Sequence, residues 1–561
     1  MTRFISLITW VIVFSSLYAG MVIITFMKKY VIVKLKYLSH EIIRIMEYEE
    51  KKGYEEPIKK IAKGAGIIFG GMFLSKVFLF VYRILIARMG VEVYGLFSLS
   101  LSILEVLLTI AFLGLDTGII RYFSYYKAKH DMARAKGVAY FSLKITFFVS
   151  LFLTAVLFIF SNEISIYLFH DFGLSSILKI VIFSLPINVL ISILFSLMRA
   201  NQDVKQAVYS RFIFENFSRL ALTIILLLLG FKILGVAVAY VISMALTLIL
   251  IFYYVRRDIL SKFKDVKLIN PSTNKLLGYS LPLIFNEITV MIFLWVDIFM
   301  IGIFLDARSV GIYNVVVPSV LLLYLFSFSL RYLFLPILTE LHSQGKKNIF
   351  SNIYRISTKW IFGVSIVIFS LFLLVSKEFL GVFFGEAYVA ETLAIFNFVL
   401  PVSVVTLILL LLGFFVLNVI TCPKEVLIIY KKTKLIAFNT IVAAIFNVIL
   451  NFYLIPIYGI IGAAVATSIS IFIWAILITI SAYSVTKVNV FGFIYVKIFL
   501  SALLALIIAF GFKVLFGFAD IFALIIYPVV FLIFYILFLF ITRSLEKDDM
   551  VIIEALKRKI S

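Results

Sequence analysis

The sequence is poor in cysteine and in charge, and each shortage excludes a class of protein. Its single cysteine, Cys422, excludes an intramolecular disulfide and a cysteine-based zinc site. Charged residues make up 14% of the 561 positions, whereas hydrophobic residues make up 64%. A water-soluble core of this size does not need so apolar a composition, so the lipid bilayer is the solvent for most of the chain.

Motifs of soluble catalysis are also missing. The GKK at Gly345 lacks the spacing and the Ser or Thr of a Walker loop, which argues against direct use of ATP. The four histidines form no cluster in the sequence, and no Asp-x-Asp pair occurs. We therefore predict a transporter rather than an enzyme, with no catalytic residues, no cofactor, and no metal beyond a coupling Na⁺ or H⁺.

Apolar segments recur along the whole chain. Each is close to the roughly 20 residues that a helix needs to cross a bilayer. They cover 5–27, 64–88, 95–118, 137–160, 177–199, 207–229, 233–255, 276–303, 310–331, 357–375, 391–417, 434–455, 459–484, 491–512 and 519–542. We predict an all-α polytopic protein of the cell membrane, in which fourteen helices follow an extra N-terminal anchor helix.

The net charge of +22 is unevenly placed along the chain. When the predicted spans are threaded alternately, most of the 51 Lys and Arg residues fall on one side. Such segments face the cytoplasm, so the bulk of the loops and the C-terminus are predicted there, with the N-terminus outside. The charge is thus a topology signal and does not indicate nucleic acid.

Three sequence patterns occur twice in the same order. The nine residues from Gly235 (GVAVAYVIS) return from Gly462 as GAAVATSIS, and the YGLF that contains Gly95 returns as VGIY around Gly311. FSLPINVLISIL from Phe183 returns later as FVLPVSVVTLIL. Corresponding spans are six apart, an even number, so both copies have the same orientation in the membrane. The repeat predicts two six-helix lobes related by an axis along the membrane normal.

The spans and the repeat divide the chain into seven parts. These are an anchor helix (1–27), a cytoplasmic amphipathic segment (28–63), a first lobe (64–257), a cytoplasmic linker (258–275), a second lobe (276–484), helices 13 and 14 (485–542) and a cytoplasmic tail (543–561).

Ionisable residues lie deep in the predicted first lobe, where each costs about 2.5–3.5 kcal/mol. Lys76 and Arg83 are seven apart on one helix, Glu105 lies on the next, and Glu215 and Arg219 are four apart. Three cations against two carboxylates predict a cavity for an anionic, phosphate-bearing substrate, because the arginine fork suits phosphate. The alternative is that Glu215 neutralises Arg219 and that Lys76 pairs with Glu105.

The predicted second lobe carries a different polar set. Asp297, Asn447, Asn451 and Thr467 fall at similar depth in three different spans. Carboxylate, amide and hydroxyl oxygens are ligands for a hard cation, and a buried Asp can also carry a proton. We predict a site for a coupling Na⁺ or H⁺. The alternative is ordinary hydrogen bonding between helices.

The sequence also resembles a known family of flippases. The runs LSKVFLFVYRILIARMGVEVYGLFSL from Leu74, SLPLIFNEITVMIFLWVDIFMIG from Ser280 and NVILNFYLIPIYGIIGAAVATSIS from Asn447 carry the resemblance, which covers about 64–542. They resemble the polysaccharide-biosynthesis flippases of the multidrug/oligosaccharidyl-lipid/polysaccharide superfamily. The resemblance implies fourteen helices in two lobes and alternating access.

The family resemblance also implies a substrate and two sites. The substrate would be a lipid-linked oligosaccharide on a polyprenyl pyrophosphate, moved from the inner to the outer leaflet. Basic residues of the first core helix would meet the pyrophosphate, here Lys76, Arg83 and Arg88. Sodium in some relatives lies between helices 7, 11 and 12, which maps onto the set around Asp297.

Other functions stay open at this point. A cation-coupled multidrug exporter of the same superfamily is the main alternative, although the excess of cations in the first lobe disfavours cationic drugs. A membrane glycosyltransferase is disfavoured by the lack of long loops, and a scaffold of envelope synthesis would not require charges at mid-membrane. The expected partners are the lipid-linked sugar, the bilayer and glycan-assembly enzymes.

Overall fold

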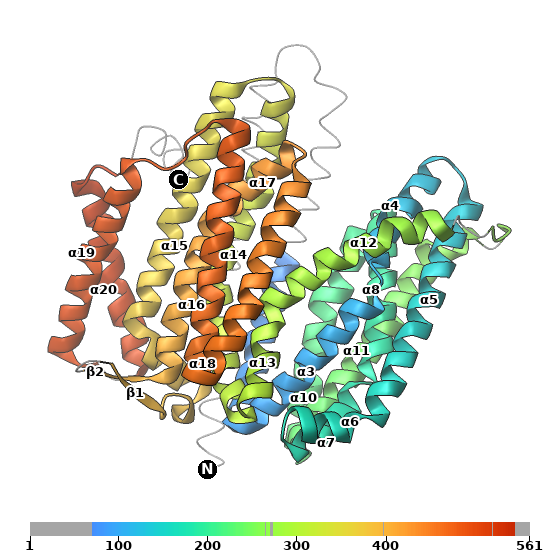
Figure 1. Ribbon diagram of the computed structural model, residues 1–561, viewed down its shortest axis with the longest axis horizontal. Helices are drawn as coiled ribbons and strands as arrows, with labels where there is room; N and C mark the ends of the chain where they lie inside the picture. Colours follow the sequence, from blue (N-terminus) through green and yellow to red (C-terminus); the bar gives the residue numbers. More distant parts are fainter. Residues whose placement is uncertain (1–69, 264, 270–272, 396–397, 519, 545–561) are drawn as a thin grey trace. The chain divides into compact units, whose positions relative to one another are not determined.

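The computed structural model describes residues 70–544 apart from 264, 270–272, 396–397 and 519. The predicted anchor 1–27, the segment 28–63 and nearly all of the tail 543–561 lie outside these residues. Helices dominate what is described, as the composition predicts (Figure 1).

The first described helix is Gly70–Ala87. It is followed by α3 (Val91–Ala111), α4 (Leu115–Ala128), α5 (Met132–Ile159), α6 (Ser161–Glu163), the π-helix η1 (Ile164–Leu168), α7 (Phe172–Val181), α8 (Ser184–Asn201), α9 (Val204–Val208), the π-helix η2 (Tyr209–Phe214), α10 (Glu215–Leu228), α11 (Lys232–Asp258) and the short 3-10 helix η3 (Leu260–Phe263).

The second half of the chain begins with α12 (Thr273–Met291), the π-helix η4 (Ile292–Val296) and α13 (Asp297–Phe304). It continues with α14 (Ala307–Ser343), α15 (Lys347–Phe384), the 3-10 helix η5 (Glu386–Tyr388), strands β1 (Thr392–Ile395) and β2 (Phe398–Pro401), α16 (Val402–Val419), α17 (Thr421–Ile429), α18 (Thr433–Thr486), α19 (Phe493–Phe516) and α20 (Asp520–Ile541).

Within the described residues, eleven helices are long and apolar enough to cross a membrane. Three features separate this number from the fourteen predicted between 64 and 542. The predicted span 207–229 is interrupted by η2, whereas 310–331 lies within the continuous helix α14 (Ala307–Ser343), of which Ala307–Leu321 is counted as a shorter apolar stretch. The spans 434–455 and 459–484 run together in α18, which is kinked at Gly459. Glycine tolerates the positive φ of 58° at that kink.

The start of the predicted span 391–417 is wrong. Residues Thr392–Ile395 and Phe398–Pro401 form an antiparallel pair of strands, and the helix begins only at Val402. Pro401 precedes the helix with φ −60° and ψ 136°, an extended conformation that proline favours. An apolar run therefore supplied both a hairpin and a helix, and hydropathy alone does not separate them.

Aspartates cap the starts of several helices. Asp131 accepts a hydrogen bond from the backbone N–H of Arg134 at the start of α5, over 3.0 Å. Asp306 does the same for Ser309 at the start of α14, over 2.7 Å. Each aspartate satisfies a backbone donor that the first helical turn leaves free.

The helices pack into two groups within the compact unit Leu74–Leu545. In the N-terminal group, α4, α5 and α8 contact one another, α11 contacts α8 and α10, and α3 contacts α5 and α8. In the C-terminal group, α14, α15, α16 and α18 pack together, with α13 and α17 against α18. Helices α19 and α20 pack against each other and against α15 (Figure 1).

The two groups meet along α3 and α14, where the glycines of the YGLF and VGIY patterns allow close approach. A Cβ on Gly95 would lie 1.7 Å from the carbonyl oxygen of Ala307, and one on Gly311 would lie 2.0 Å from that of Val91. The contact is reciprocal, because Gly95 and Gly311 differ by 216 positions, as do Val91 and Ala307. The amide of Asn314 also donates to the hydroxyl of Ser98, which lies the same 216 positions earlier.

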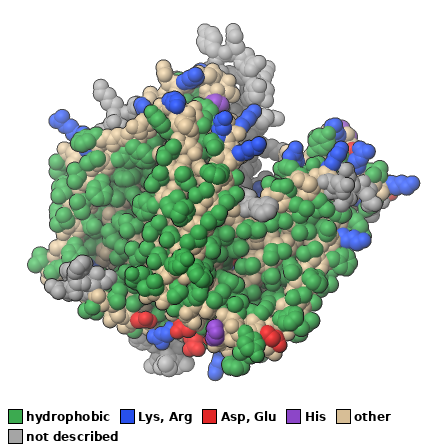
Figure 2. Space-filling model, in the orientation of Figure 1, with side chains coloured by type: hydrophobic (Ala, Val, Ile, Leu, Met, Phe, Trp, Pro, Cys, Tyr) green, Lys and Arg blue, Asp and Glu red, His purple; other side chains and the backbone are tan. Residues whose placement is uncertain are grey.

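Apolar side chains cover the outside of the helices. Leu228 is 83% exposed and Leu515 is 81% exposed, which would be unfavourable in water. Figure 2 shows a broad hydrophobic band, with Lys and Arg gathered at one end of the helices and a smaller set of charged residues at the other. This is the surface of a multi-pass membrane protein.

Candidate functional sites in the two groups of helices

Asp297 in the C-terminal group is buried and surrounded by hydrogen-bond donors. It is the first residue of α13, directly after the π-helix η4, and is 6% exposed. The amide nitrogen of Asn451 donates to its Oδ1 over 2.8 Å. The hydroxyls of Thr467 and Tyr313 donate to its Oδ2 over 2.6 and 2.5 Å. Within the described residues, Asp297 is thus held by neutral groups rather than by Lys or Arg.

The remaining predicted residue of this set completes the network. Asn447 donates to the Thr467 hydroxyl over 2.9 Å, and its Oδ1 accepts from Asn451 over 3.3 Å. All four predicted residues therefore meet, although they come from α13 and from two parts of α18 on either side of the Gly459 kink. Spacing and depth in the sequence were sufficient to group them.

Tyr313 belongs to this cluster and was missed. It is 1% exposed and lies on α14, near the start of the helix that follows α13. The sequence could have indicated Tyr313. Because α13 ends at Phe304 and α14 begins at Ala307, residues a few positions before and after this turn lie at similar depth in the membrane. A depth count along the predicted spans singles out charged, amide and threonine side chains. A tyrosine is missed because its ring makes it part of the apolar run.

A small cavity of about 20 Å³ lies beside the Asp297 carboxylate. Tyr313, Thr467, Phe293 and Phe414 are among its lining residues. This volume is enough for one water-sized occupant. The Oδ1 of Asn451 is buried and accepts no hydrogen bond, although a buried amide oxygen normally has a donor or a cation nearby. A carboxylate and two hydroxyls line this space, and the two amides are hydrogen-bonded to them from outside it. Such a set suits a hard cation or a proton.

The N-terminal group buries a cluster in which ions pair with each other. Glu215 is the first residue of α10, directly after the π-helix η2. Its Oε1 accepts from Arg219 over 2.6 Å and its Oε2 from Arg211 over 2.8 Å. Arg211 also donates to the side-chain oxygen of Asn188 over 3.1 Å. The alternative in which Glu215 pairs with Arg219 is confirmed, and Arg211, which is not in the predicted set, is a third member.

Aromatic rings and a second carboxylate complete this cluster. The guanidinium of Arg219 lies 4.7 Å from the centre of the Tyr240 ring and 5.9 Å from that of Tyr82, within range of cation–π attraction. Glu105 on α3 lies within electrostatic range of both Arg211 and Arg219. The cluster therefore balances two arginines against two glutamates.

The three basic residues of the first described helix have separate surroundings. Lys76 is exposed and forms no ion pair with Glu105, so that alternative is wrong. Arg83 is half-buried, has Tyr94 as an electrostatic neighbour, and leaves its buried Nη1 without a hydrogen-bond partner. Arg88 donates from Nε to the carbonyl of Phe383 over 3.0 Å and from Nη2 to that of Val382.

The contacts of Arg88 are those of a helix cap. Val382 and Phe383 are in the last turn of α15, whose final carbonyls have no partner within the helix. A cation there also interacts favourably with the negative end of the helix dipole. In this structure Arg88 therefore joins the first described helix to the end of α15, while Arg83 keeps a donor free.

The fold is shared with known membrane transport proteins. The fold is similar to that of the lipid II flippase MurJ in an inward closed conformation, with a TM-score of 0.67 and 18% identity, over 85% of this chain and 99% of that one. It is also similar to an inward-facing multidrug resistance MATE family transporter of the MOP superfamily, with a TM-score of 0.57 and 16% identity, over 74% of this chain and 94% of that one. Identities this low show the fold alone, which this chain shares with these multi-pass membrane proteins.

The family follows from the sequence models. The polysaccharide biosynthesis protein model matches residues 61–342, and the MatE model matches residues 282–453. The chain belongs to the polysaccharide biosynthesis protein family, as the resemblance predicted.

Two curated relatives come from archaea. An uncharacterised membrane protein of Methanocaldococcus jannaschii is 25% identical over 74% of this chain and 82% of that protein. The probable low-salt glycan biosynthesis flippase Agl15 of Haloferax volcanii is 27% identical over 44% of this chain, which spans half of that relative.

Proposed function

We propose that this protein is a flippase that moves a lipid-linked oligosaccharide, carried on a polyprenyl pyrophosphate, from the inner to the outer leaflet of the cell membrane. Family membership and the similarity to a glycan biosynthesis flippase support the substrate class. The observation that carries the proposal is Arg83, because a buried guanidinium nitrogen without a partner is a site for an anionic oxygen.

We propose further that the chain forms fourteen core helices in two six-helix lobes related by an axis along the membrane normal. The reciprocal contacts of Gly95 and Gly311 support this arrangement. A two-fold axis between two copies produces every contact twice, once from each copy, as seen for Gly95 with Ala307 and for Gly311 with Val91. The pairing of Ser98 with its own repeat equivalent, Asn314, supports such an axis between α3 and α14. Rocking of the lobes about this contact would give alternating access.

The substrate anion would be bound in the first lobe. Lys76 and Arg83 would meet the pyrophosphate, since they lie on one face of the same helix and neither is taken up by a carboxylate among the described residues. Arg219, Glu215 and Glu105 would shape the cavity electrostatically, because with Arg211 their charges are already balanced. Arg88 would act at the edge of this region, through its contact with α15.

A coupling cation, Na⁺ or H⁺, would be bound at Asp297. The carboxylate, the hydroxyls of Thr467 and Tyr313 and the amide oxygens of Asn447 and Asn451 would hold it. Rotation of the Asn451 side-chain amide would turn its unpartnered oxygen toward the Asp297 carboxylate. The amide nitrogen that now donates to Asp297 would then be replaced by an oxygen that can bind the cation. The network would then differ between the cation-bound and cation-free states, which is what coupling requires.

We also propose the orientation that the charge distribution predicts. The end rich in Lys and Arg would face the cytoplasm together with the C-terminus, and the N-terminus would lie outside. Glycan-assembly enzymes on the cytoplasmic side would supply the substrate.

A cation-coupled multidrug exporter is the second candidate. It is favoured by the MatE match over residues 282–453, which includes Asp297. The two candidates differ in the charge of the substrate, and free cations such as Lys76 in the first lobe favour an anion.

The deciding experiment is flipping of a fluorescent polyprenyl-pyrophosphate sugar by the purified full chain in proteoliposomes. We expect flipping by the wild type and its loss in Lys76→Ala and Arg83→Ala. Lys144→Ala is the matched control, because Lys144 is also an exposed lysine on a membrane helix but lies outside the proposed site. Export of a cationic dye without flipping of the sugar lipid would overturn the proposal in favour of the exporter.

A further inference from the structure

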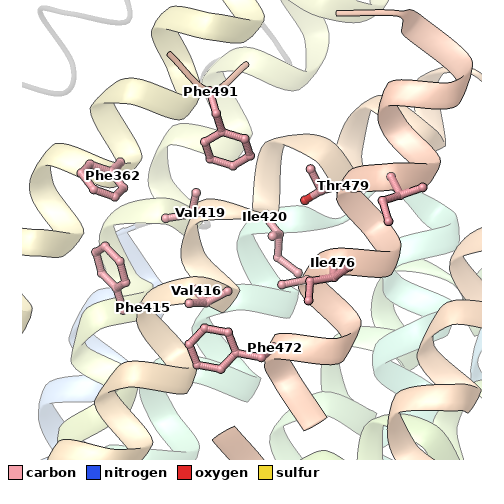
Figure 3. A pocket seen from close by; sticks show the side chains of 11 residues that line it. Phe362, Phe415, Val416, Val419, Ile420, Phe472, Ile476, Thr479 and Phe491 are labelled. Atoms are coloured by element: carbon pink, nitrogen blue, oxygen red, sulfur yellow. The ribbon is translucent and has the colours of Figure 1, made fainter. Parts of the chain in front are cut away.

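An apolar cavity of about 390 Å³ lies between α15, α16 and α18 in the C-terminal group. Figure 3 shows its lining. Phe362 comes from α15, and Phe491 comes from the segment before α19. Helix α16 and the residue after it supply Phe415, Val416, Val419 and Ile420, and α18 supplies Phe472, Ala475, Ile476, Thr479 and Ile480. Thr479 supplies the one polar side chain among the lining residues. The volume corresponds to about thirteen groups the size of a water molecule, which is similar to that of a methylene.

The cavity opens sideways, away from the Asp297 cluster. Its floor is buried, with Val419 6% and Ala475 5% exposed, whereas Ile476 and Ile480 at its rim are 57% and 60% exposed. Helix α16 separates it from the small cavity at Asp297, since Phe414 lines the latter and the next residue, Phe415, lines the former. An occupant therefore enters from the bilayer.

The polarity of α18 changes along this opening. Phe472, Ile476 and Thr479 follow one another at helical spacing and so lie on one face. Tyr483 is one turn further along the same face, and the ammonium of Lys487 lies 5.9 Å from the centre of its ring. Lys487 is exposed at the end of the helix. The order along the face is thus hydrocarbon, hydroxyl, aromatic ring and cation.

One cation, Lys487, thus lies at this end of the cavity. An apolar slot that ends beside an aromatic ring and a cation complements a lipid with an anionic headgroup.

We propose that this cavity binds one hydrocarbon chain of an anionic bilayer phospholipid, whose headgroup lies at Lys487. The lipid is distinct from the transported substrate, which would lie between the two groups of helices on the far side of α16. It fills the space between α16 and α18, and so supports the helix that carries Thr467 and Asn451. The site is independent of whether the protein flips a sugar lipid or exports a drug.

The test is photolabelling of the full-length protein in nanodiscs. The probes are phosphatidylglycerol and phosphatidylcholine that carry the same diazirine-labelled acyl chain, with labelled peptides mapped by mass spectrometry. We expect phosphatidylglycerol to label 472–480 and 415–420 in preference to phosphatidylcholine. Thr479→Trp, which fills the mouth of the cavity at a half-buried position, should abolish this labelling. Leu503→Trp on the exposed face of α19 is the matched control and should leave it intact.

A second variant tests the headgroup without altering the cavity. Lys487→Gln should lower the preference for phosphatidylglycerol about fivefold, the effect of one cation at a membrane surface. Because Lys487 is exposed, this variant decides the question even if Thr479→Trp does not fold. Equal labelling of α18 and α19, labelling that survives Thr479→Trp, or displacement of the probe by a polyprenyl phosphate at equal concentration would each overturn the proposal.

Discussion

Glu215 in the N-terminal group is held between two arginines, whereas Asp297 in the C-terminal group is held by a tyrosine, a threonine and an asparagine. Both carboxylates are buried, and each directly follows a π-helix, a feature that often marks functional positions. The first is neutralised by fixed partners. The second has no fixed cation among the described residues, so it is the one whose charge an exchangeable cation can balance.

The largest expected effect comes from removing the carboxylate between the arginines. Glu215→Ala leaves Arg211 and Arg219 buried without their partner, so we expect a loss of about 3–5 kcal/mol of stability. Thermal unfolding in detergent, followed by size-exclusion chromatography, measures it. The double variant Glu215→Ala/Arg219→Ala should recover part of this loss. Equal stability of Glu215→Ala and wild type would show that the ion cluster does not hold this group together.

The contact between the two groups should respond equally from either side. Gly95→Ala and Gly311→Ala each place a Cβ at 2.0 Å or less from a carbonyl oxygen, so α3 and α14 must move apart. We expect each to cost about 1–3 kcal/mol, as overpacking does. Gly511→Ala is the control, because the added Cβ meets open space, and it should be neutral. Gly230 also has open space but has a positive φ that strains alanine, so it does not serve as a control. Very different costs at Gly95 and Gly311 would contradict the two-fold relation.

Asp297→Asn should change function more than stability. The amide keeps the shape of the carboxylate and part of its hydrogen bonding, so we expect a cost of about 1 kcal/mol. Transport should lose its dependence on Na⁺ or on the proton gradient, because the negative charge is gone. Flipping assays with and without each gradient measure this. Unchanged ion dependence would rule out Asp297 as the coupling site.

Tyr313→Phe should give the smallest effect. It removes one hydrogen bond to Asp297 and leaves the ring in place, so we expect about 0.6 kcal/mol, the average for such bonds between membrane helices. The concentration of coupling ion at half-maximal transport should shift several-fold, while the maximal rate stays close to wild type. A shift in maximal rate alone would mean that Tyr313 acts on helix movement rather than on the cation.

Prediction from sequence succeeded where depth in the membrane decides the position of a residue. Asp297, Asn447, Asn451 and Thr467 were grouped because each lies at a similar count from a loop, and the structure joins them through hydrogen bonds. The count missed Arg211 because it lies close to the end of the predicted span 207–229, where a basic side chain usually reaches the membrane surface. It failed for the β1–β2 hairpin because an apolar run has no visible boundary between strand and helix.

The sequence by itself determined that the chain is a multi-pass membrane protein, roughly where most helices lie, that two of its parts are related, and that Asp297, Asn447, Asn451 and Thr467 belong together. These follow from hydropathy, charge and repetition, all of which are local. Only the tertiary structure decided that Arg88 caps α15, that Arg211 joins Glu215, and that Tyr313 completes the Asp297 cluster. The reason is that partners are chosen by helix rotation and packing, which depend on contacts between segments far apart in the chain.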